Sequence, residues 1–223
     1  MKLSIRLRLA AVVLLSLLPV LLLGHLFVSQ SQKEINFAFK ELKGTTYLDA
    51  IAPDMRALAA SAPMPASKEF AQVGEMLDPE IGSGPLSEAY FAIRPGSNEP
   101  AYSSAVSTAL LSLVAKIGDG SNLILDPDLD SYYVMDIQVI KLPGVLDAGA
   151  ALLDRVVRAG RSPTQDERIA ILASAGTFSG LATGVQSSFA SAVAGNVDGL
   201  VDRNLREHVE KAVSSAEAFS RAI

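Results

Sequence analysis

Apolar residues are concentrated in one long run near the N-terminus. Within residues 9–28 the only interruptions are Ser16, Pro19, Gly24 and His25. About 20 residues of helix, at 1.5 Å of rise per residue, span the roughly 30 Å hydrocarbon thickness of a bilayer. The pattern therefore predicts a transmembrane helix over residues 9–28, preceded by a short basic segment over residues 1–8.

A cleaved signal peptide is the alternative for this run. Signal peptides usually carry an apolar region of about 7–15 residues, followed by an A-x-A-like cleavage site. Here the run is longer and no such site follows it, which favours an uncleaved anchor. Because Lys2, Arg6 and Arg8 precede the run, the positive-inside rule places the N-terminus in the cytoplasm. Residues 29–223 are then extracytoplasmic, which in a bacterium means the periplasm, with a single-pass anchor in the inner membrane.

Beyond the anchor, apolar residues recur every three to four positions, which is the spacing of one face of an α-helix. The segments with this spacing are 106–117, 132–156, 171–192 and 205–223. We find no alternating pattern flanked by hairpin turns that would indicate β-strands. The sequence predicts an all-α protein, with the N-terminal transmembrane helix followed by an antiparallel helical bundle, similar to a four-helix bundle, over residues 29–223.

The region that follows the anchor is expected to be less regular. The first extracytoplasmic helix continues from the anchor, its apolar stripe slips phase at 44–47, and Pro53 is expected to kink or restart it. Six of the chain's 11 prolines lie between residues 63 and 105. This composition predicts only short helices there, near residues 67–77 and 86–93. We expect the chain to end before a second transmembrane helix, because the last apolar pattern has no stop signal.

Three alternating aspartates, at positions 126, 128 and 130, are similar to the start of an EF-hand loop. That loop requires Gly at its sixth position and Glu at its twelfth, where this chain has Ser131 and Ile137. A calcium site is therefore not expected. Asp126 is instead predicted to cap a helix that begins at Pro127.

Two further helix boundaries are predicted from the same signals. Ser162 is expected to cap a helix whose first residue is Pro163, because proline is favoured at the first helical position. The Gly195–Asn196 pair is expected to separate this helix from the last one.

The composition excludes several classes of function. The chain has no Cys and only two His, so it has no disulfide framework, no thiol nucleophile and no His-based metal cluster or triad. The net charge is -5, and the part beyond the basic N-terminus is more acidic still, which excludes a nucleic-acid-binding surface. We find no phosphate-binding glycine loop and no G-x-S-x-G or H-E-x-x-H motif. We therefore expect no enzyme activity, no catalytic residue, no metal ligand and no cofactor.

One candidate site lies on the predicted helix 132–156. Tyr132 falls on its apolar seam, and Asp136 falls on the shoulder of that seam, close to Tyr133. A carboxylate at the edge of a core needs a hydrogen-bond partner. The partner is either a Tyr, Lys or Asn of a neighbouring helix, in a purely structural network, or a ligand.

The second candidate segment is residues 40–48 of the first helix. Its change of register leaves room for a pocket beside Glu41 and Tyr47, whereas the alternative is an exposed charged face with Gly44 allowing close helix approach. We expect Glu41, Tyr47, Tyr132, Tyr133 and Asp136 to form one ligand-binding site, suited to a small polar or cationic ligand.

Two stretches carry a family resemblance: KELKGTTYLDAIAP at residues 40–53 and SNLILDPDLDSYYVMDIQVIKLPGVLD at residues 121–147. With the basic N-terminus and the anchor, they resemble the N-terminal sensor region of bacterial methyl-accepting chemotaxis proteins and membrane-bound, often hybrid, sensor histidine kinases. The resemblance implies a periplasmic ligand-sensing module that acts as a homodimer. It also implies a second transmembrane helix, a HAMP linker and a signalling module in full-length relatives.

Two other classes of function remain open. One is a membrane-anchored periplasmic adaptor or structural protein that binds a partner protein. The other is an anchored enzyme, which would require a deep pocket with a strongly perturbed carboxylate.

Overall fold

The computed structural model describes residues 5–96, 99, 103–125, 128–197 and 199–222. All regular structure within these ranges is helical, with no β-strand, so the all-α prediction is confirmed. The chain forms two compact units, Met1–Glu41 and Leu42–Ile223, and each is described by itself below.

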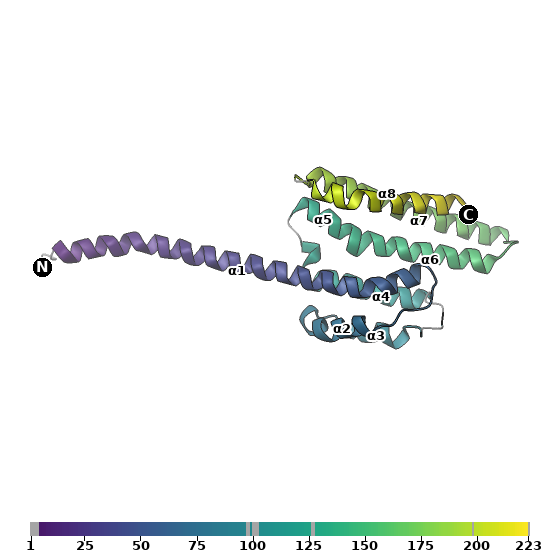
Figure 1. Cartoon of the computed structure of the whole chain (residues 1–223), viewed down its shortest axis with the longest axis horizontal. Coiled ribbons are helices and arrows are strands. Elements are labelled where there is room, and N and C mark those ends of the chain that lie inside the picture. The colour runs from purple at the N-terminus through teal and green to yellow at the C-terminus, as the bar shows by residue number, and fades with distance from the viewer. Residues whose placement is uncertain (1–4, 97–98, 100–102, 126–127, 198, 223) are drawn as a thin grey trace. The chain divides into compact units, whose positions relative to one another are not determined.

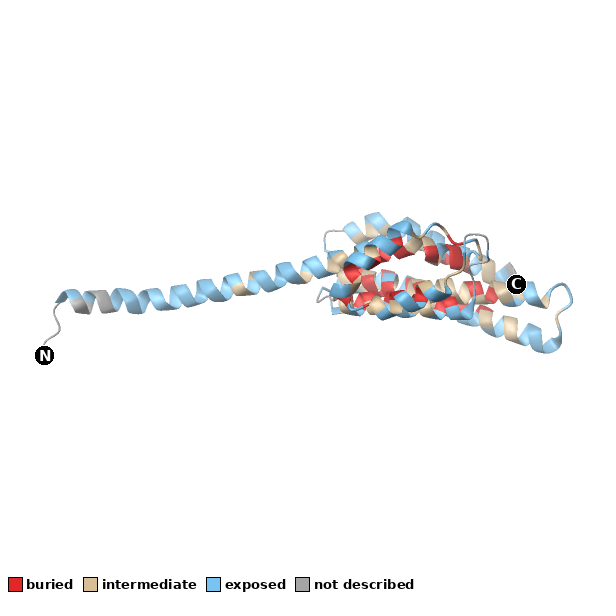
Figure 2. Cartoon of the chain, turned by 90° about the horizontal axis from the view of Figure 1, so that it is seen from below, coloured by how far each residue is buried: buried red, intermediate tan, exposed pale blue. Residues whose placement is uncertain are grey.

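The first unit contains the N-terminal part of α1 (Ile5–Ala59). Every residue from 12 to 28 is exposed, as the blue colour of this part of α1 shows in Figure 2. In the described part of the chain, two helices are long and apolar enough to cross a membrane: α1 and α7 (Gln165–Gly195). The first of these contains the predicted anchor, residues 9–28.

The second unit contains the rest of α1 and all later elements. These are α2 (Lys68–Ile81), α3 (Gly84–Ile93), α4 (Ser104–Gly120), the 3₁₀ turn η1 (Leu123–Leu125), α5 (Leu129–Met135), the π-helical segment η2 (Asp136–Lys141), α6 (Leu142–Ala159), α7 and α8 (Leu200–Ala222). The short helices predicted near 67–77 and 86–93 are confirmed as α2 and α3. The expected restart at Pro53 is wrong, because α1 continues through Pro53 to Ala59.

One hydrophobic core joins the end of α1 to α2, α3, α4 and the beginning of the helix that follows η1. Its completely buried side chains include Tyr47, Ile51, Tyr90, Leu113 and Ile117. Aromatic rings contact one another within it: the ring centroid of Phe70 lies 5.6 Å from that of Tyr90, in a tilted arrangement, and 6.1 Å from that of Tyr47, edge to face. This core fixes α2 and α3 against the α1 residues that follow the apolar run.

A glycine allows α1 to approach the end of α4 closely. Gly44 is buried, and a Cβ added there would meet the side chain of Ser121 and, at 2.8 Å, Cδ1 of Leu123. Ser121 is itself almost completely buried and donates to the carbonyl oxygen of Ile117 at 2.6 Å. The stretches 40–53 and 121–147 therefore meet at this contact.

A second core lies between α6, α7 and α8, which lie side by side in Figure 1. Leu152 is completely buried, and Phe178, Ala182 and Ala216 are nearly so. Phe178 also meets Phe219 edge to face, with ring centroids 5.7 Å apart. Small and large side chains together fill the space between the three helices in this core.

The predicted helix 132–156 is interrupted, and its apolar seam is displaced. The π segment η2 separates α5 from α6. Tyr132, expected on the seam, is 39% exposed. After η2 the buried residues of α6 are Pro143, Ala150 and Leu152, which are neighbours of the predicted seam residues Leu142, Gly149 and Leu153.

The structure confirms one of the predicted helix boundaries and contradicts another. The cap predicted at Ser162 is wrong: Thr164 caps α7 and forms a capping box with Glu167. In this box each side chain bonds the other residue's backbone N–H, which a Ser–Pro start does not provide. The predicted end at Gly195 is confirmed. The cap predicted at Asp126 and Pro127 lies outside the described residues.

Candidate functional site

A polar cluster in the second unit is centred on Asp136, at the start of the π segment. Lys141 Nζ lies 2.6 Å from Asp136 Oδ2, and Ser188 Oγ of α7 donates to the same oxygen at 2.5 Å. Lys141 also donates to Ser188. We call Asp136, Lys141 and Ser188 the Asp136 cluster.

The three residues of the Asp136 cluster are buried to different extents. Ser188 is 2% exposed, whereas the side chains of Asp136 and Lys141 are 12% and 30% exposed. The stem of Lys141 crosses α7 beside Gly184, where a Cβ would lie 3.6 Å from Lys141 Cε. The ammonium therefore compensates a nearly buried carboxylate and is itself within reach of water.

Tyr47 has a different set of partners. Its hydroxyl donates to Asp78 Oδ1 at 2.8 Å and contacts Ser87 Oγ at 3.4 Å. Ser83 donates to the same Asp78 oxygen at 2.6 Å. Burial raises the pKa of Tyr47, and the Asp78 carboxylate raises this pKa further.

A third cluster is the most completely buried. Arg94 donates to both oxygens of Asp54, from Nε at 2.6 Å and from Nη2 at 2.8 Å. Tyr90 donates to Asp54 Oδ2 at 2.6 Å, and Arg94 Nη2 also donates to the carbonyl oxygen of Pro65. Asp54 is 2% exposed. This bidentate ion pair fixes α3 and the chain after α1 to the end of α1.

The two buried tyrosines predict a loss of stability in alkali. Burial, followed by the neighbouring carboxylate, raises the pKa of both Tyr47 and Tyr90. An unfolded tyrosine ionises near pH 10. Above that pH the unfolded chain releases protons that the folded chain retains, so we expect the free energy of unfolding to fall as pH rises from about 10.

Urea unfolding of the full chain in mild detergent, measured between about pH 8 and 11, checks this expectation. The Tyr47→Phe/Tyr90→Phe variant should show a shallower decline, because it lacks both groups. An equal slope in the two proteins would contradict the assignment.

The remaining predicted site residues are placed as follows. The rings of Tyr132 and Tyr133 meet edge to face, with centroids 5.4 Å apart, and Tyr133 is half-buried. Glu41 is the last residue of the first unit. Tyr47 and Asp136 each have their own hydrogen-bond partners in the second unit. Ligand binding by these five residues stays a prediction.

Sequence reasoning missed Asp54, Arg94 and Ser188. Asp54 and Arg94 are 40 residues apart and Asp136 and Ser188 are 52 apart, and a single sequence carries no pattern for such pairs. Lys141 lies five residues after Asp136, a spacing that an α-helix does not bring together.

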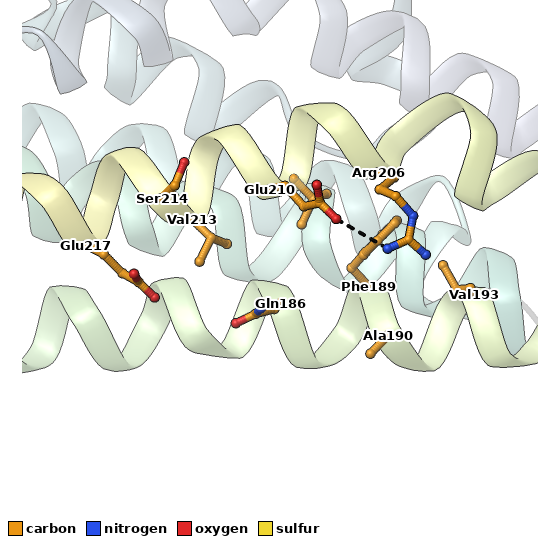
Figure 3. Close-up of a pocket in the computed structure, with 10 residues that line it drawn as sticks. Gln186, Phe189, Ala190, Val193, Arg206, Glu210, Val213, Ser214 and Glu217 are labelled. Carbon is orange, nitrogen blue, oxygen red and sulfur yellow. Dashed lines mark hydrogen bonds and ion pairs between the residues drawn. The ribbon is translucent and has the colours of Figure 1, made fainter.

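A surface groove of about 470 Å³ lies between α7 and α8 (Figure 3). Phe189, Val193 and Val213 contribute apolar lining, and Arg206 lies over the Phe189 ring at 5.9 Å. Arg206 is paired with Asp202 at 2.5 Å and with Glu210 at 3.3 Å. The groove is therefore amphipathic, with its charged side chains already paired.

Among the residues that the structure describes, no three His, Asp or Glu side chains are grouped as metal ligands. No protein family, curated protein or solved structure matches the chain. The resemblance carried by residues 40–53 and 121–147 therefore enters the functional argument as an expectation.

Proposed function

We propose that the chain is the extracytoplasmic ligand-sensing module of a bacterial transmembrane signal-transduction receptor, either a chemoreceptor or a sensor histidine kinase. The observation that carries the proposal is the continuity of α1. A single helix begins with an exposed apolar stretch and ends in a core that includes Tyr47, Ile51 and Asp54. In the proposed receptor, this helix links the membrane-spanning segment to the folded sensor domain along the chain.

The finer assignments belong to the same proposal. Residues 9–28 span the inner membrane once, residues 1–8 are cytoplasmic, and residues 29–223 form a periplasmic helical bundle that works as a homodimer. A HAMP linker and a signalling module complete the receptor in full-length relatives. The module itself is not an enzyme and holds no cofactor.

Sensing requires two packings of the helices that bind a ligand unequally. The Asp136 cluster is suited to this, because its carboxylate, ammonium and hydroxyl groups bond one another and the ammonium remains partly accessible. A small polar ligand that forms the same bonds would replace one of these partners. The helices carrying them would then shift relative to each other.

A binding experiment tests the proposal on the full chain in nanodiscs. The probes are amino acids, dicarboxylates and short polyamines, and the measured quantity is Tm. Ligand at 100 times its Kd adds about 2.7 kcal/mol to stability. For a domain of this size each kcal/mol raises Tm by roughly 2–4 °C. We expect at least one compound class to raise Tm by several degrees in the native chain.

The matched variant is Asp136→Asn, which keeps the size of the side chain and removes its charge. We expect the Tm response to disappear in Asp136→Asn. Its stability without ligand should fall by about 1.5–3 kcal/mol, the range for hydrogen bonds to a charged group. A panel without any effect on Tm, or equal shifts in both proteins, would contradict a ligand site at Asp136.

One observation favours the second candidate, an anchored adaptor that binds a partner protein. The exposed face of α7 begins with Ile169 and Leu172, which are 59% and 66% exposed, and residues 169–197 include no charged residue. Such a face is unusual for a helix in water. A Tm that responds to a purified partner protein but to no small compound would select this candidate.

A further inference from the structure

The part of α1 that follows the apolar run carries exposed apolar side chains on one side. Ile35 and Phe39 are 49% and 57% exposed, and residues four apart are neighbours on a helix surface. Among the described residues of the first unit, α1 is the only element, so no other segment of that unit covers this side. An isolated helix of this kind gains little stability in water and is usually stabilised by packing of its apolar face.

The exposed apolar side continues toward the N-terminus with heptad spacing. Counting back from Phe39, steps of four, three, four and three residues lead to positions 35, 32, 28 and 25. Such steps average 3.5 residues, which is the period of a coiled coil, and the row corresponds to its inner a and d positions. We call this row the α1 seam. Its members are His25, Val28, Gln32, Ile35 and Phe39.

The charged residues of this part of α1 all lie away from the α1 seam. At 100° per residue, those between 29 and 41 fall on the opposite side of the helix: Lys33, Glu34, Lys40 and Glu41. In a parallel pair of helices related by a two-fold axis, each inner residue meets its own copy, so a charge there would face an equal charge. The distribution of charge therefore permits pairing through the α1 seam and opposes pairing through the other side.

Phe37 is the one large apolar residue between 29 and 41 that lies outside the α1 seam. It falls in the middle of the charged side and is half-buried. Lys33 and Glu41 lie one turn before and one turn after it, and long charged side chains cover apolar surface with their stems. Phe37 therefore supplies a matched control position for the seam.

The two polar members of the α1 seam indicate which partner fits it. His25 lies inside the apolar run, where the backbone groups of the helix bond one another and a polar side chain needs a partner from another helix. A parallel second copy of the chain places an identical imidazole at the same level. Gln32 likewise meets its own copy, and a side-chain amide carries both a donor and an acceptor. A polar residue at an a position also fixes the register and the number of helices.

We propose that two copies of the chain pair in parallel through the α1 seam, with His25 and Gln32 as the residues that fix the register. The inference rests on the proposed function, in which residues 9–28 anchor the chain and the chain works as a homodimer. It adds the surface through which the two copies meet. Because both anchors lie in one membrane, the two α1 helices run in the same direction and their seams lie at the same level.

The absence of Cys from the sequence makes disulfide cross-linking a direct test. Ile35→Cys, Phe37→Cys and Phe39→Cys are introduced separately into the full chain, which is placed in phosphatidylcholine vesicles with lipid in large excess. The measured quantity is the rate at which disulfide-linked dimers form under mild oxidation. A disulfide requires Cα atoms about 4.4–6.8 Å apart, a separation that only the inner positions of a paired helix approach. We expect the thiols at 35 and 39 to cross-link about tenfold faster than the thiol at 37.

Charge substitutions separate pairing through the α1 seam from random collision. In the Phe39→Cys background, Ile35→Glu places equal charges opposite each other and should slow cross-linking by about tenfold. Phe37→Glu makes the same kind of replacement on the opposite side and should leave the rate unchanged. His25→Leu should slow cross-linking by about threefold or more, the effect of losing a hydrogen bond between helices in a membrane.

Equal rates at 35, 37 and 39 would refute the seam, and so would a larger effect of Phe37→Glu than of Ile35→Glu. A rate that does not respond to His25→Leu would exclude His25 from the contact. Slow cross-linking at all three positions would also overturn the proposal. Reaction with a water-soluble maleimide then shows whether the seam is uncovered or is covered by another part of the chain. The ligand-dependent Tm tests the sensing role separately, so a failure here leaves that role to its own binding test.

Discussion

Asp54→Ala is expected to lower the free energy of unfolding by about 3–5 kcal/mol, the usual effect of removing one partner from a buried ion pair. Asp54 accepts two bonds from Arg94 and one from Tyr90, and it is 2% exposed. Without the carboxylate, a largely buried guanidinium loses its counter-charge. The penalty therefore comes chiefly from the uncompensated charge of Arg94.

Urea unfolding of the full chain in mild detergent, followed by helical circular dichroism, measures this effect. The matched control is Asp154→Ala, which breaks the more exposed ion pair with Arg158 and should lower stability by about 1 kcal/mol or less. The double variant Asp54→Leu/Arg94→Met should recover much of the loss, because apolar residues of similar volume often replace a buried pair without penalty. A double variant as unstable as Asp54→Ala would refute the uncompensated charge as the cause.

Gly44→Ala should lower the free energy of unfolding by about 1–3 kcal/mol through overpacking, even though Ala is the better helix former. The added methyl group would meet the side chain of Ser121 and, at 2.8 Å, Cδ1 of Leu123. Ser121 is nearly buried and bonded to Ile117, so it has little freedom to move away. The steric penalty thus exceeds the gain in helix propensity of about 1 kcal/mol.

Gly176→Ala is expected to change the free energy of unfolding in the opposite direction in the same measurement. Gly176 lies inside α7, and no atom would lie within 4 Å of an added Cβ. Helix propensity then acts alone, and stability should rise by roughly 0.5–1 kcal/mol. If Gly44→Ala were also stabilising, the close approach of α1 to Ser121 would not be a feature of the folded chain.

The helices and helix ends that could be predicted from the sequence are those that depend on local residue preferences. The density of proline around residues 63–105 indicated the short helices α2 and α3, and the Gly195–Asn196 pair marked the end of α7. Met135 and Val139 of the predicted seam are buried, whereas Tyr132 is 39% exposed. A seam drawn with one uniform period also does not anticipate the π segment.

The pairing of polar residues within the core could not be predicted from local residue preferences. Asp136 was correctly singled out as a carboxylate in need of a partner, and the structure supplies Lys141 and Ser188. Nothing in the sequence marks Asp54 and Arg94 as partners, since each is an ordinary charged residue until the fold brings them together. Long-range pairing depends on tertiary packing, which no local pattern records.

The uncharged face of α7 has a consequence for biogenesis. On the proposed export route, residues 169–197 pass the translocation channel before α7 has folded against its neighbours. Leu, Ile, Phe and Val each favour entry into the bilayer by only about 0.3–0.6 kcal/mol. The Gly, Ser and Thr residues that alternate with them in α7 add hydroxyl groups and exposed backbone, which oppose entry. On the proposed single-pass topology, these small polar residues are what keeps α7, one of the two described helices long and apolar enough to cross a membrane, from acting as a stop-transfer segment.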